Sequence, residues 1–225
     1  HLNNIVYYIL LSVVFVTPLI FWDSFLFSST FTKTLFFISV VDVALIFWLP
    51  VAFEKRQRLK QSAVSIAIII FAGVAFASSF AGVDLYQSTW SNYERMMGLW
   101  TIAHVVLFFL MIITVVYESK IVLLLRVVVA SASIVSLIGI NEMIGGRGAV
   151  RIESTLYNSA FLASYLLLSS FITFWLMISE KRIKYESIVL STAFILMIIT
   201  VFFTGTRGSI IALVAGSVFM IVIFL

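Results

Sequence analysis

Four arginines stand in short connections between long apolar stretches of the chain: Arg95, Arg147, Arg151 and Arg207. A guanidinium group binds a phosphate through two parallel hydrogen bonds, whereas the ammonium of a lysine offers a mobile point charge. Lysine is nearly absent from these connections. The arginines therefore predict the binding of an anionic, phosphate-bearing ligand.

The residues around these arginines strengthen the prediction. Residues 145–158 read GGRGAVRIESTLYN and residues 204–209 read TGTRGS, so glycines and short polar side chains flank three of the arginines. Glycine lets the backbone approach an anion closely, and a helix that begins near Arg207 adds free N–H groups. Arg95 follows aromatic residues that suit the membrane–water interface. We expect the anion to contact Arg95, Arg147, Thr155, Asn158 and Thr206.

An alternative is that each arginine is an interfacial anchor, which reaches lipid headgroups or pairs with a nearby carboxylate such as Glu94 or Glu153. Basic residues are expected to be scarce on one side of a membrane, and these four occupy that side. Four arginines on that side depart from the positive-inside rule, which the rest of the chain follows. Such a departure favours a functional role for the arginines, the binding of a ligand.

The composition defines the class of protein. Hydrophobic residues make up 63% of the chain and charged residues 11%, and the mean hydropathy is +1.19. The apolar runs are about as long as a helix that crosses a hydrocarbon core of roughly 30 Å, and they do not alternate as barrel strands do. We predict an all-α fold, a polytopic transmembrane helical bundle, that does not bind nucleic acid. The chain has no cysteine, which excludes disulfides, thiolate metal sites and cysteine nucleophiles.

The apolar runs predict eight spans within a single transmembrane domain, residues 1–225. The first run lacks a basic leader and a cleavage site, so it is interpreted as a retained helix. Because the chain starts at His1 and ends inside an apolar run at Leu225, we expect it to be the N-terminal part of a longer protein. The spans lie at about residues 5–22, 34–53, 62–82, 99–117, 121–140, 159–178, 188–203 and 209–225.

Two basic clusters predict the orientation. Residues 54–60 (EKRQRLK) and 181–184 (KRIK) occupy connections of the same parity, and the positive-inside rule places both in the cytoplasm. Both ends of the chain are then cytoplasmic, and the outer connections hold Lys33 and the four arginines.

Three stretches carry a family resemblance: ERMMGL (94–99), RIESTLYNSAFLASYL (151–166) and FFTGTRGSIIALV (202–214). In order and spacing they resemble the O-antigen ligase and O-antigen polymerase superfamily of bacterial membrane proteins. Arg151, Thr155 and Asn158 match one motif of that family, and Thr206, Arg207 and Gly208 match a second. The chain departs from the pattern at Tyr157, where the family usually has glycine, and at Ser159, where a proline or second polar residue is common.

The resemblance implies a metal-independent glycosyltransferase, without cofactors, at the outer face of the bacterial cytoplasmic membrane. It would move a glycan from a polyprenyl diphosphate carrier to a lipid, glycan or protein acceptor; ligase, polymerase and protein O-glycosyltransferase remain alternatives. Arg151 and Arg207 would be the catalytic residues, because preorganised cations stabilise the charge that develops on the departing diphosphate. No outward cluster of Asp, Glu and His has metal-ligand spacing, which agrees with this role.

The base that activates the acceptor hydroxyl is less defined. Among the outward carboxylates Asp23 is favoured, because many polyprenyl-dependent glycosyltransferases carry a catalytic carboxylate in the first outer loop. His104 and Asp42 lie within predicted spans, where hydrogen bonds between helices are favoured over a catalytic role or an ion pathway. The other outward carboxylates are Asp84, Glu94, Glu142 and Glu153.

Two other classes of protein remain open. A transporter or flippase of lipid-linked sugars could use the same arginines without breaking a bond, and paired intramembrane charges, discontinuous helices or an inverted repeat would support it. A purely structural membrane subunit would leave the arginines unexplained. Small residues spaced by four predict helix-packing faces along Gly73, Ala77 and Ala81 and along Gly208, Ala212 and Gly216.

Overall fold

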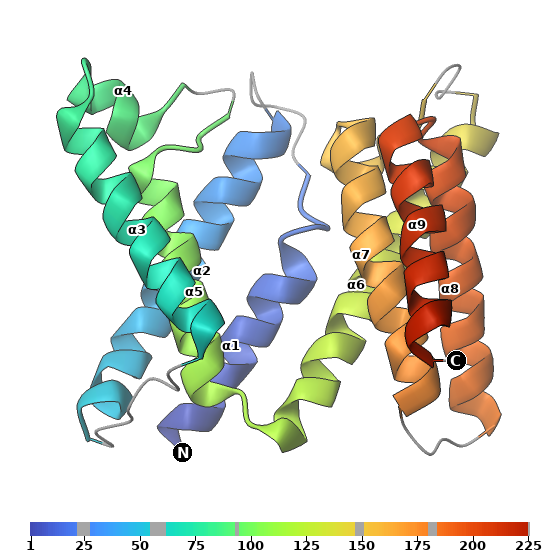
Figure 1. Ribbon diagram of the computed structural model, residues 1–225, viewed down its shortest axis with the longest axis horizontal. Helices are drawn as coiled ribbons and strands as arrows, with labels where there is room; N and C mark the ends of the chain where they lie inside the picture. The colour runs from blue at the N-terminus through green and yellow to red at the C-terminus, as the bar shows by residue number, and fades with distance from the viewer. Residues whose placement is uncertain (22–27, 55–61, 93–94, 147–150, 180–183, 225) are drawn as a thin grey trace. The chain divides into compact units, whose positions relative to one another are not determined.

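The computed structural model describes residues 1–21, 28–54, 62–92, 95–146, 151–179 and 184–224. All regular structure in these ranges is helical (Figure 1). The elements are α1 (Leu2–Val16), α2 (Ser28–Glu54), α3 (Ala63–Ala81), α4 (Leu85–Trp90), α5 (Leu99–Val115), α6 (Glu118–Ile144), η1 (Ser154–Leu156), α7 (Ser159–Ser179), α8 (Lys184–Phe203) and α9 (Arg207–Phe224).

The class of protein is confirmed: the chain is all-helical, and several helices suit a membrane. Five helices within the described ranges are long and apolar enough to cross a bilayer, while α1, α5 and α9 are shorter apolar helices. Each of the eight predicted spans coincides with one of these helices. The number of spans and the orientation of the termini stay predictions. The five long segments are Thr30–Phe53, Ala63–Ala81, Glu118–Ile144, Ser159–Ser179 and Tyr185–Phe203.

The structure corrects the bounds of the first span and adds a short helix. The first helix ends at Val16 rather than near residue 22, because Pro18 has no N–H to continue the helical ladder. The sequence prediction also missed α4. The carboxylate of Asp84 caps this helix by accepting the N–H of Gln87 at 3.0 Å. Asp84, one of the carboxylates considered as a base, is therefore an N-cap.

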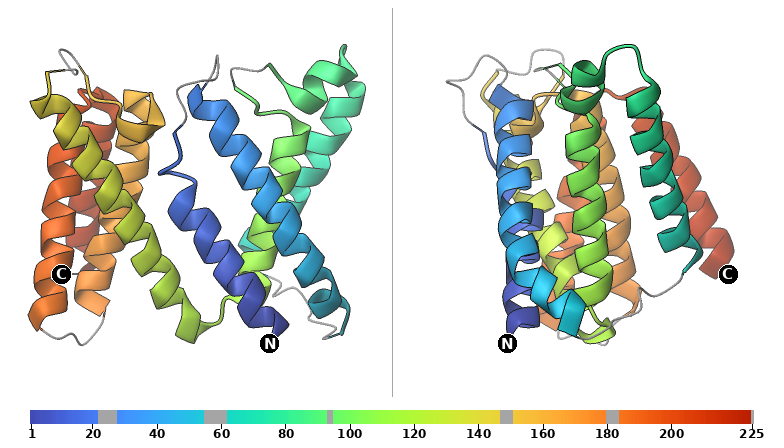
Figure 2. Two further views of the ribbon diagram at one scale, coloured as in Figure 1. Left: turned by 180° about the vertical axis from the view of Figure 1, so that it is seen from behind. Right: turned by 90° about the vertical axis from the view of Figure 1, so that its left-hand side faces the viewer.

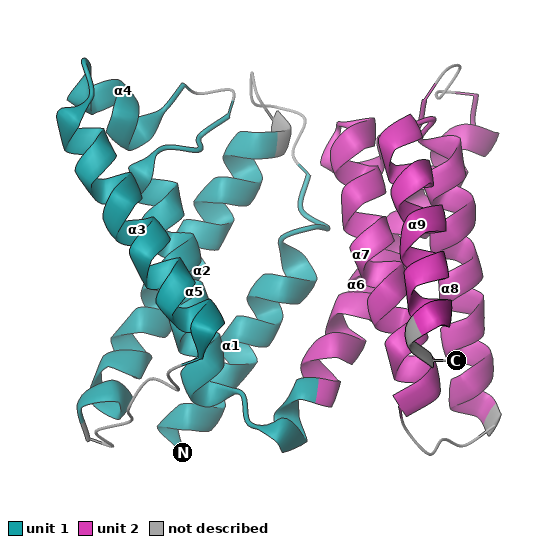
Figure 3. Cartoon of the chain, viewed as in Figure 1, with its two compact units in different colours: residues 1–121 teal, residues 122–225 magenta. Residues whose placement is uncertain are grey.

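The chain divides into two compact units, and the boundary between them in the sequence falls within α6 (Figure 3). Unit 1 comprises His1–Ile121 and unit 2 comprises Val122–Leu225. The single transmembrane domain stays a prediction.

Unit 1 is built around the contacts of α2 and α5. Helix α1 packs against α2, and α5 packs against α1, α2 and α3, as the views in Figure 2 also show. Apolar side chains fill the interior because their removal from polar surroundings is favourable and close packing adds dispersion energy. Fully buried members of this core are Val6, Leu10, Val41, Ala44 and Met111.

Unit 2 packs α7 against α8, with α9 against both. Its interior is unusually rich in small hydroxyl residues, which let helices approach closely in a membrane. Several hydroxyls bond the carbonyl one turn earlier in their own helix, as Thr173 does to Ser169 and Thr200 to Leu196, both at 2.8 Å. At one end of the unit, Arg126 in α6 forms an ion pair with Glu186 in α8 at 2.7 Å.

The prediction of two small-residue packing faces is largely wrong. Gly73 and Gly208 have open space where a side chain would begin, and Ala77, Ala81 and Ala212 are exposed in the described structure. Spacing alone cannot tell which face of an apolar helix meets a neighbour. Gly216 is the exception, because a Cβ atom there would meet the ring of Phe171 in α7.

Replacement of Gly216 by alanine is therefore expected to lower the thermal unfolding temperature in detergent. Overpacking costs about 1–3 kcal/mol, which exceeds the gain of about 1 kcal/mol from replacing a helical glycine. Gly73→Ala is the matched control and should leave the unfolding temperature unchanged or raise it. An equal effect of the two substitutions would contradict the close α7–α9 contact.

Candidate functional site

The loop between α6 and α7 is held by a carboxylate of α6. Oε2 of Glu142 accepts the backbone N–H of Glu153 at 3.2 Å and that of Ser154 at 2.8 Å. The hydroxyl of Ser154 in turn donates to the carbonyl oxygen of Val135 at 2.7 Å. These bonds fix residues 153–154 on α6. Glu142, another carboxylate considered as a base, therefore has a clear structural role as the anchor of this loop.

Buried side chains and close packing against α6 and α8 also hold this loop in place. Ile152 is 1% exposed and Thr155 is 3% exposed. A Cβ atom at Gly139 would lie 3.4 Å from Cβ of Ser154 and 3.4 Å from Cγ2 of Thr200, so the loop, α6 and α8 approach closely at this glycine. Thr155 therefore packs in the interior, and Arg151, at the start of the loop, is exposed.

The start of α7 is capped by Asn158. Its Oδ1 atom accepts the N–H of Ala160 at 2.8 Å and that of Phe161 at 3.3 Å, which is the usual action of an N-cap. The residue before it, Tyr157, has a φ of 51° in the left-handed region. Glycine adopts this conformation at little cost, so the departure from the family pattern at Tyr157 falls where the backbone favours glycine.

The central contact of the site joins the two arginine segments. Nη2 of Arg151 donates to the carbonyl oxygen of Gly205 at 2.8 Å, across 54 residues of sequence. Gly205 has a φ of +63°, and a Cβ atom there would lie 3.4 Å from Nε of Arg151. The arginine therefore lies directly over this glycine turn. Arg207, two residues further on, begins α9 and is exposed.

A second contact joins the glycine turn to α7. The hydroxyl of Thr206 donates to the carbonyl oxygen of Ser159 at 3.3 Å. Helix α7 begins at Ser159 and α9 begins at Arg207, so two helix N-termini meet here. Each N-terminus carries a partial positive charge from the helix dipole. We call residues 151–158 together with residues 204–207 the arginine site; it contains two arginines, two helix N-termini and one carboxylate, that of Glu153.

Five of the predicted site residues belong to the arginine site of unit 2. Arg95 belongs to unit 1, where its backbone N–H bonds Oδ1 of Asn92 at 3.1 Å and its side chain is exposed. Arg147 and Asp23 lie outside the described residues. The five residues in the arginine site are Arg151, Thr155, Asn158, Thr206 and Arg207.

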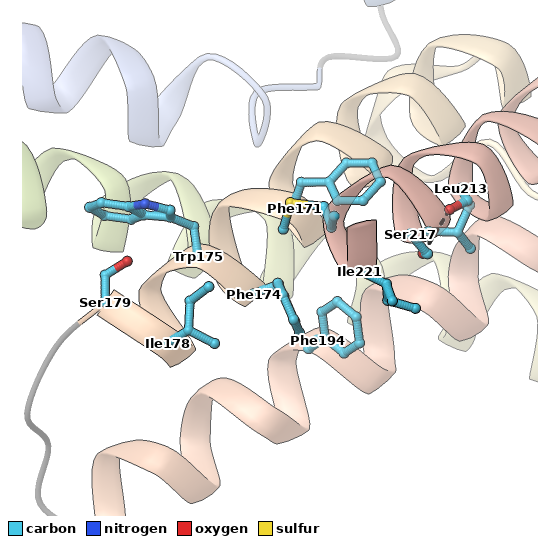
Figure 4. A pocket seen from close by; sticks show the side chains of 10 residues that line it. Phe171, Phe174, Trp175, Ile178, Ser179, Phe194, Leu213, Ser217 and Ile221 are labelled. Carbon is cyan, nitrogen blue, oxygen red and sulfur yellow. Dashed lines mark hydrogen bonds between the residues drawn. The ribbon is translucent and has the colours of Figure 1, made fainter. Parts of the chain in front are cut away.

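Unit 2 also contains an apolar cavity of about 710 Å³ between α7, α8 and α9 (Figure 4). Phe171, Phe174 and Trp175 of α7 form one wall, and Phe194 of α8 and Leu213 of α9 lie opposite. Sequence analysis did not predict this cavity. The signal was present in the spacing of Phe171, Phe174, Trp175 and Ile178, which places four large apolar residues on one face of a helix.

Unit 1 contains a polar pair within its helices. Nε2 of His104 in α5 lies 3.1 Å from Oδ1 of Asp42 in α2. The sequence predicts a hydrogen bond between helices for Asp42 and another for His104. Both predictions are confirmed by this single contact. The sequence did not show that the two residues are partners, because 62 residues separate them.

The described residues contain no group of three or more His, Asp or Glu side chains that could hold a metal ion. Comparison of the chain with protein-family models, with curated proteins and with solved structures finds no match.

Replacement of Glu142 by alanine is expected to destabilise the loop. It leaves two backbone N–H groups without their acceptor, at a cost of about 1–3 kcal/mol for each group that stays buried. The measurement is thermal unfolding in detergent, together with proteolysis at residues 147–153. Glu118→Ala, at the exposed start of the same helix, is the control and should change neither. Wild-type behaviour of Glu142→Ala would show that the loop is held by other contacts.

Proposed function

We propose that the protein is an O-antigen ligase-like membrane glycosyltransferase, which moves a glycan from a polyprenyl diphosphate carrier to a lipid, glycan or protein acceptor. The observation that carries the proposal is the hydrogen bond from Arg151 to Gly205. It joins the two segments in which the resemblance to this superfamily is most specific. Both segments are also those in which arginine, glycine and hydroxyl groups predict a phosphate site.

The charge of the arginine site suits a diphosphate. A guanidinium has five N–H donors in a fixed planar arrangement, and the bond to Gly205 engages Nη2 of Arg151 alone. The remaining donors, the Arg207 guanidinium and the N-terminus of α9 are available to phosphate oxygens. Cleavage of the bond between the sugar and the diphosphate increases the negative charge on the diphosphate. Cations held in place before the reaction stabilise that charge without reorganisation.

The apolar cavity suits the hydrocarbon part of the same substrate. Leu213, on its wall, lies six residues after Arg207 in α9, a rise of roughly 9 Å along a helix. The lining continues from there to Ile178 and Ser179 at the far end of α7, so a carrier lipid whose diphosphate is held at the arginine site would place later isoprene units in the cavity. Aromatic and branched apolar side chains favour such a chain over water.

The carboxylates divide into structural residues and candidates for the base. Asp84 caps α4 and Glu142 holds the loop 153–154, so neither is assigned this role. Asp23, which lies outside the described residues, remains the preferred base. It would accept the proton of the acceptor hydroxyl as that oxygen attacks the sugar.

The proposal places the arginine site on the outer side of the bacterial cytoplasmic membrane. Eight spans with both termini cytoplasmic put residues 145–158 and 204–208 outside and the basic clusters inside. Membrane lipid surrounds the apolar helices. The glycan donor and the acceptor would both reach the site from this outer side.

Conservative replacement of either catalytic arginine tests the proposed function. Arg151→Lys and Arg207→Lys keep the charge but lose the guanidinium donors, so release of free polyprenyl diphosphate from a lipid-linked glycan should fall by about 100-fold or more. The assay uses purified full-length protein with candidate acceptors. Arg126→Lys, in the same unit but paired with Glu186, is the control and should keep full turnover. Wild-type turnover in Arg151→Lys or Arg207→Lys would refute the role of that arginine.

The proposed orientation can be tested with single cysteines, because the chain has none of its own. Gln87 in α4 and Tyr185 at the start of α8 are both exposed. In intact cells, a membrane-impermeant maleimide should label Gln87→Cys and should label Tyr185→Cys only after the membrane is permeabilised. The opposite pattern would place the arginine site on the cytoplasmic side.

A transporter or flippase of lipid-linked sugars is the second candidate. A pair of ionisable residues within the membrane helices would support this function, and unit 1 contains such a pair in Asp42 and His104. The same turnover assay separates the two functions. Only a transferase releases free polyprenyl diphosphate, whereas a flippase moves the intact lipid-linked sugar across vesicles.

A further inference from the structure

Glu153 supplies the carboxylate of the arginine site, and this carboxylate has no structural partner. The residue is exposed, and its side chain forms no hydrogen bond or ion pair with the residues that the structure describes. It occupies the N-cap position of η1, but its side chain caps no N–H group there. Asp84 and Glu142, by contrast, each accept backbone N–H groups. The carboxylate of Glu153 is therefore available to a ligand.

The backbone of Glu153 is held in place, so its side chain starts from a fixed point. Its N–H donates to Oε2 of Glu142 at 3.2 Å, and its carbonyl oxygen accepts the N–H of Leu156 at 3.2 Å. The preceding residue, Ile152, is 1% exposed, whereas its two neighbours, Arg151 and Glu153, are exposed. Because Ile152 is directed inward, Arg151 and Glu153 belong to the same exposed surface of the loop.

Arg151 and Glu153 do not neutralise each other, although one residue separates them. The guanidinium of Arg151 donates instead to the neutral carbonyl oxygen of Gly205 at 2.8 Å. Arg207 likewise forms no ion pair with a carboxylate of the described residues. The pairing of Arg151 with Glu153, which the interpretation as an interfacial anchor allows, is therefore not formed. Cations and a carboxylate stand in one site, and each keeps its own capacity for hydrogen bonds.

These two kinds of group suit different substrates of a transfer reaction. A carboxylate only accepts hydrogen bonds, and its negative charge repels the oxygens of a diphosphate. An acceptor hydroxyl is an uncharged hydrogen-bond donor, and it must reach the bond between the sugar and the diphosphate for transfer to occur. Of the two substrates that meet in the arginine site, only the acceptor gains from a contact with Glu153.

We propose that Glu153 is an acceptor-binding residue, whose carboxylate accepts a hydrogen bond from a hydroxyl next to the attacking one. This inference rests on the proposed glycan transfer and adds the acceptor to it. The attacking hydroxyl gives its own proton to the base, so the bond to Glu153 requires a second hydroxyl. A sugar provides neighbouring hydroxyls, whereas a serine or threonine side chain provides one. The acceptor is accordingly a sugar, and the carboxylate disfavours a sugar that carries a phosphate or carboxylate at this position.

Removal of the charge should affect the two substrates in opposite directions. In Glu153→Gln, the affinity of the full-length protein for inorganic pyrophosphate, measured by calorimetry at low salt, should rise about two- to tenfold because a repulsion is lost. In the assay of polyprenyl diphosphate release, kcat/KM for the sugar acceptor should fall about 10-fold or more, because a hydrogen bond to a charged group is lost. KM for the lipid-linked donor should not increase. A purely structural role of Glu153 would weaken both substrates.

Glu118→Gln, at the exposed start of α6, is the matched control and should change neither the pyrophosphate affinity nor the acceptor kinetics. The unfolding temperature of Glu153→Gln should equal that of the wild type, since its side chain bonds none of the described residues. If Glu153→Gln keeps wild-type acceptor kinetics, or binds pyrophosphate no more tightly, the role of Glu153 is wrong and the proposed function stands. Turnover with a protein acceptor alone would also overturn this role. A wild type that releases no polyprenyl diphosphate with any acceptor would instead end the proposed function, and the role of Glu153 with it.

Discussion

The need to satisfy polar groups without water shapes this protein more than any other constraint. An apolar surrounding provides no hydrogen bonds, so a lone backbone or side-chain polar group there costs several kcal/mol. Helices satisfy the backbone within each segment, and Thr173 and Thr200 satisfy their hydroxyls on the preceding turn of their own helix. Where the backbone leaves the helical form near α7, the Glu142 carboxylate supplies the missing acceptor. The Asp42–His104 pair solves the same problem for two ionisable side chains.

The same constraint explains how unit 2 can present arginines without being disrupted by them. The loop 151–158 carries its own internal bonds, with Glu142 and Ser154 fixing one end and Asn158 capping α7 at the other. Arg151 can then extend over Gly205, whose left-handed backbone conformation favours glycine. The result is a pair of arginine-bearing segments held on a rigid base, which is the arrangement that the proposed binding of a diphosphate requires.

The two units differ in the chemistry that they offer. Unit 2 presents cations and helix N-termini at one end and an apolar cavity along its helices, and both suit a lipid-linked anion. Unit 1 offers a contact between a carboxylate and an imidazole that joins two helices. An arginine keeps its charge at any ordinary pH. A permanent charge suits a permanent binding site for an anion.

Composition and the lengths of the apolar runs determined that the chain is helical and suited to a membrane, because a segment without water has few other ways to satisfy its backbone. The local motifs also determined that Arg151 and Arg207 stand beside helix starts and that Asp42 needs a hydrogen-bond partner. Only the tertiary structure showed that this partner is His104. It also showed that Glu142 anchors the loop before α7 and that Arg151 lies over Gly205. It also showed that a Cβ atom at Gly73 would have open space among the described residues, while one at Gly216 would meet the ring of Phe171. The sequence of an apolar helix in a membrane has no strong hydrophobic periodicity, so it does not specify which face of the helix is buried. The contacts of Arg151 with Gly205 and of Asp42 with His104, across 54 and 62 residues, depend on which faces are buried.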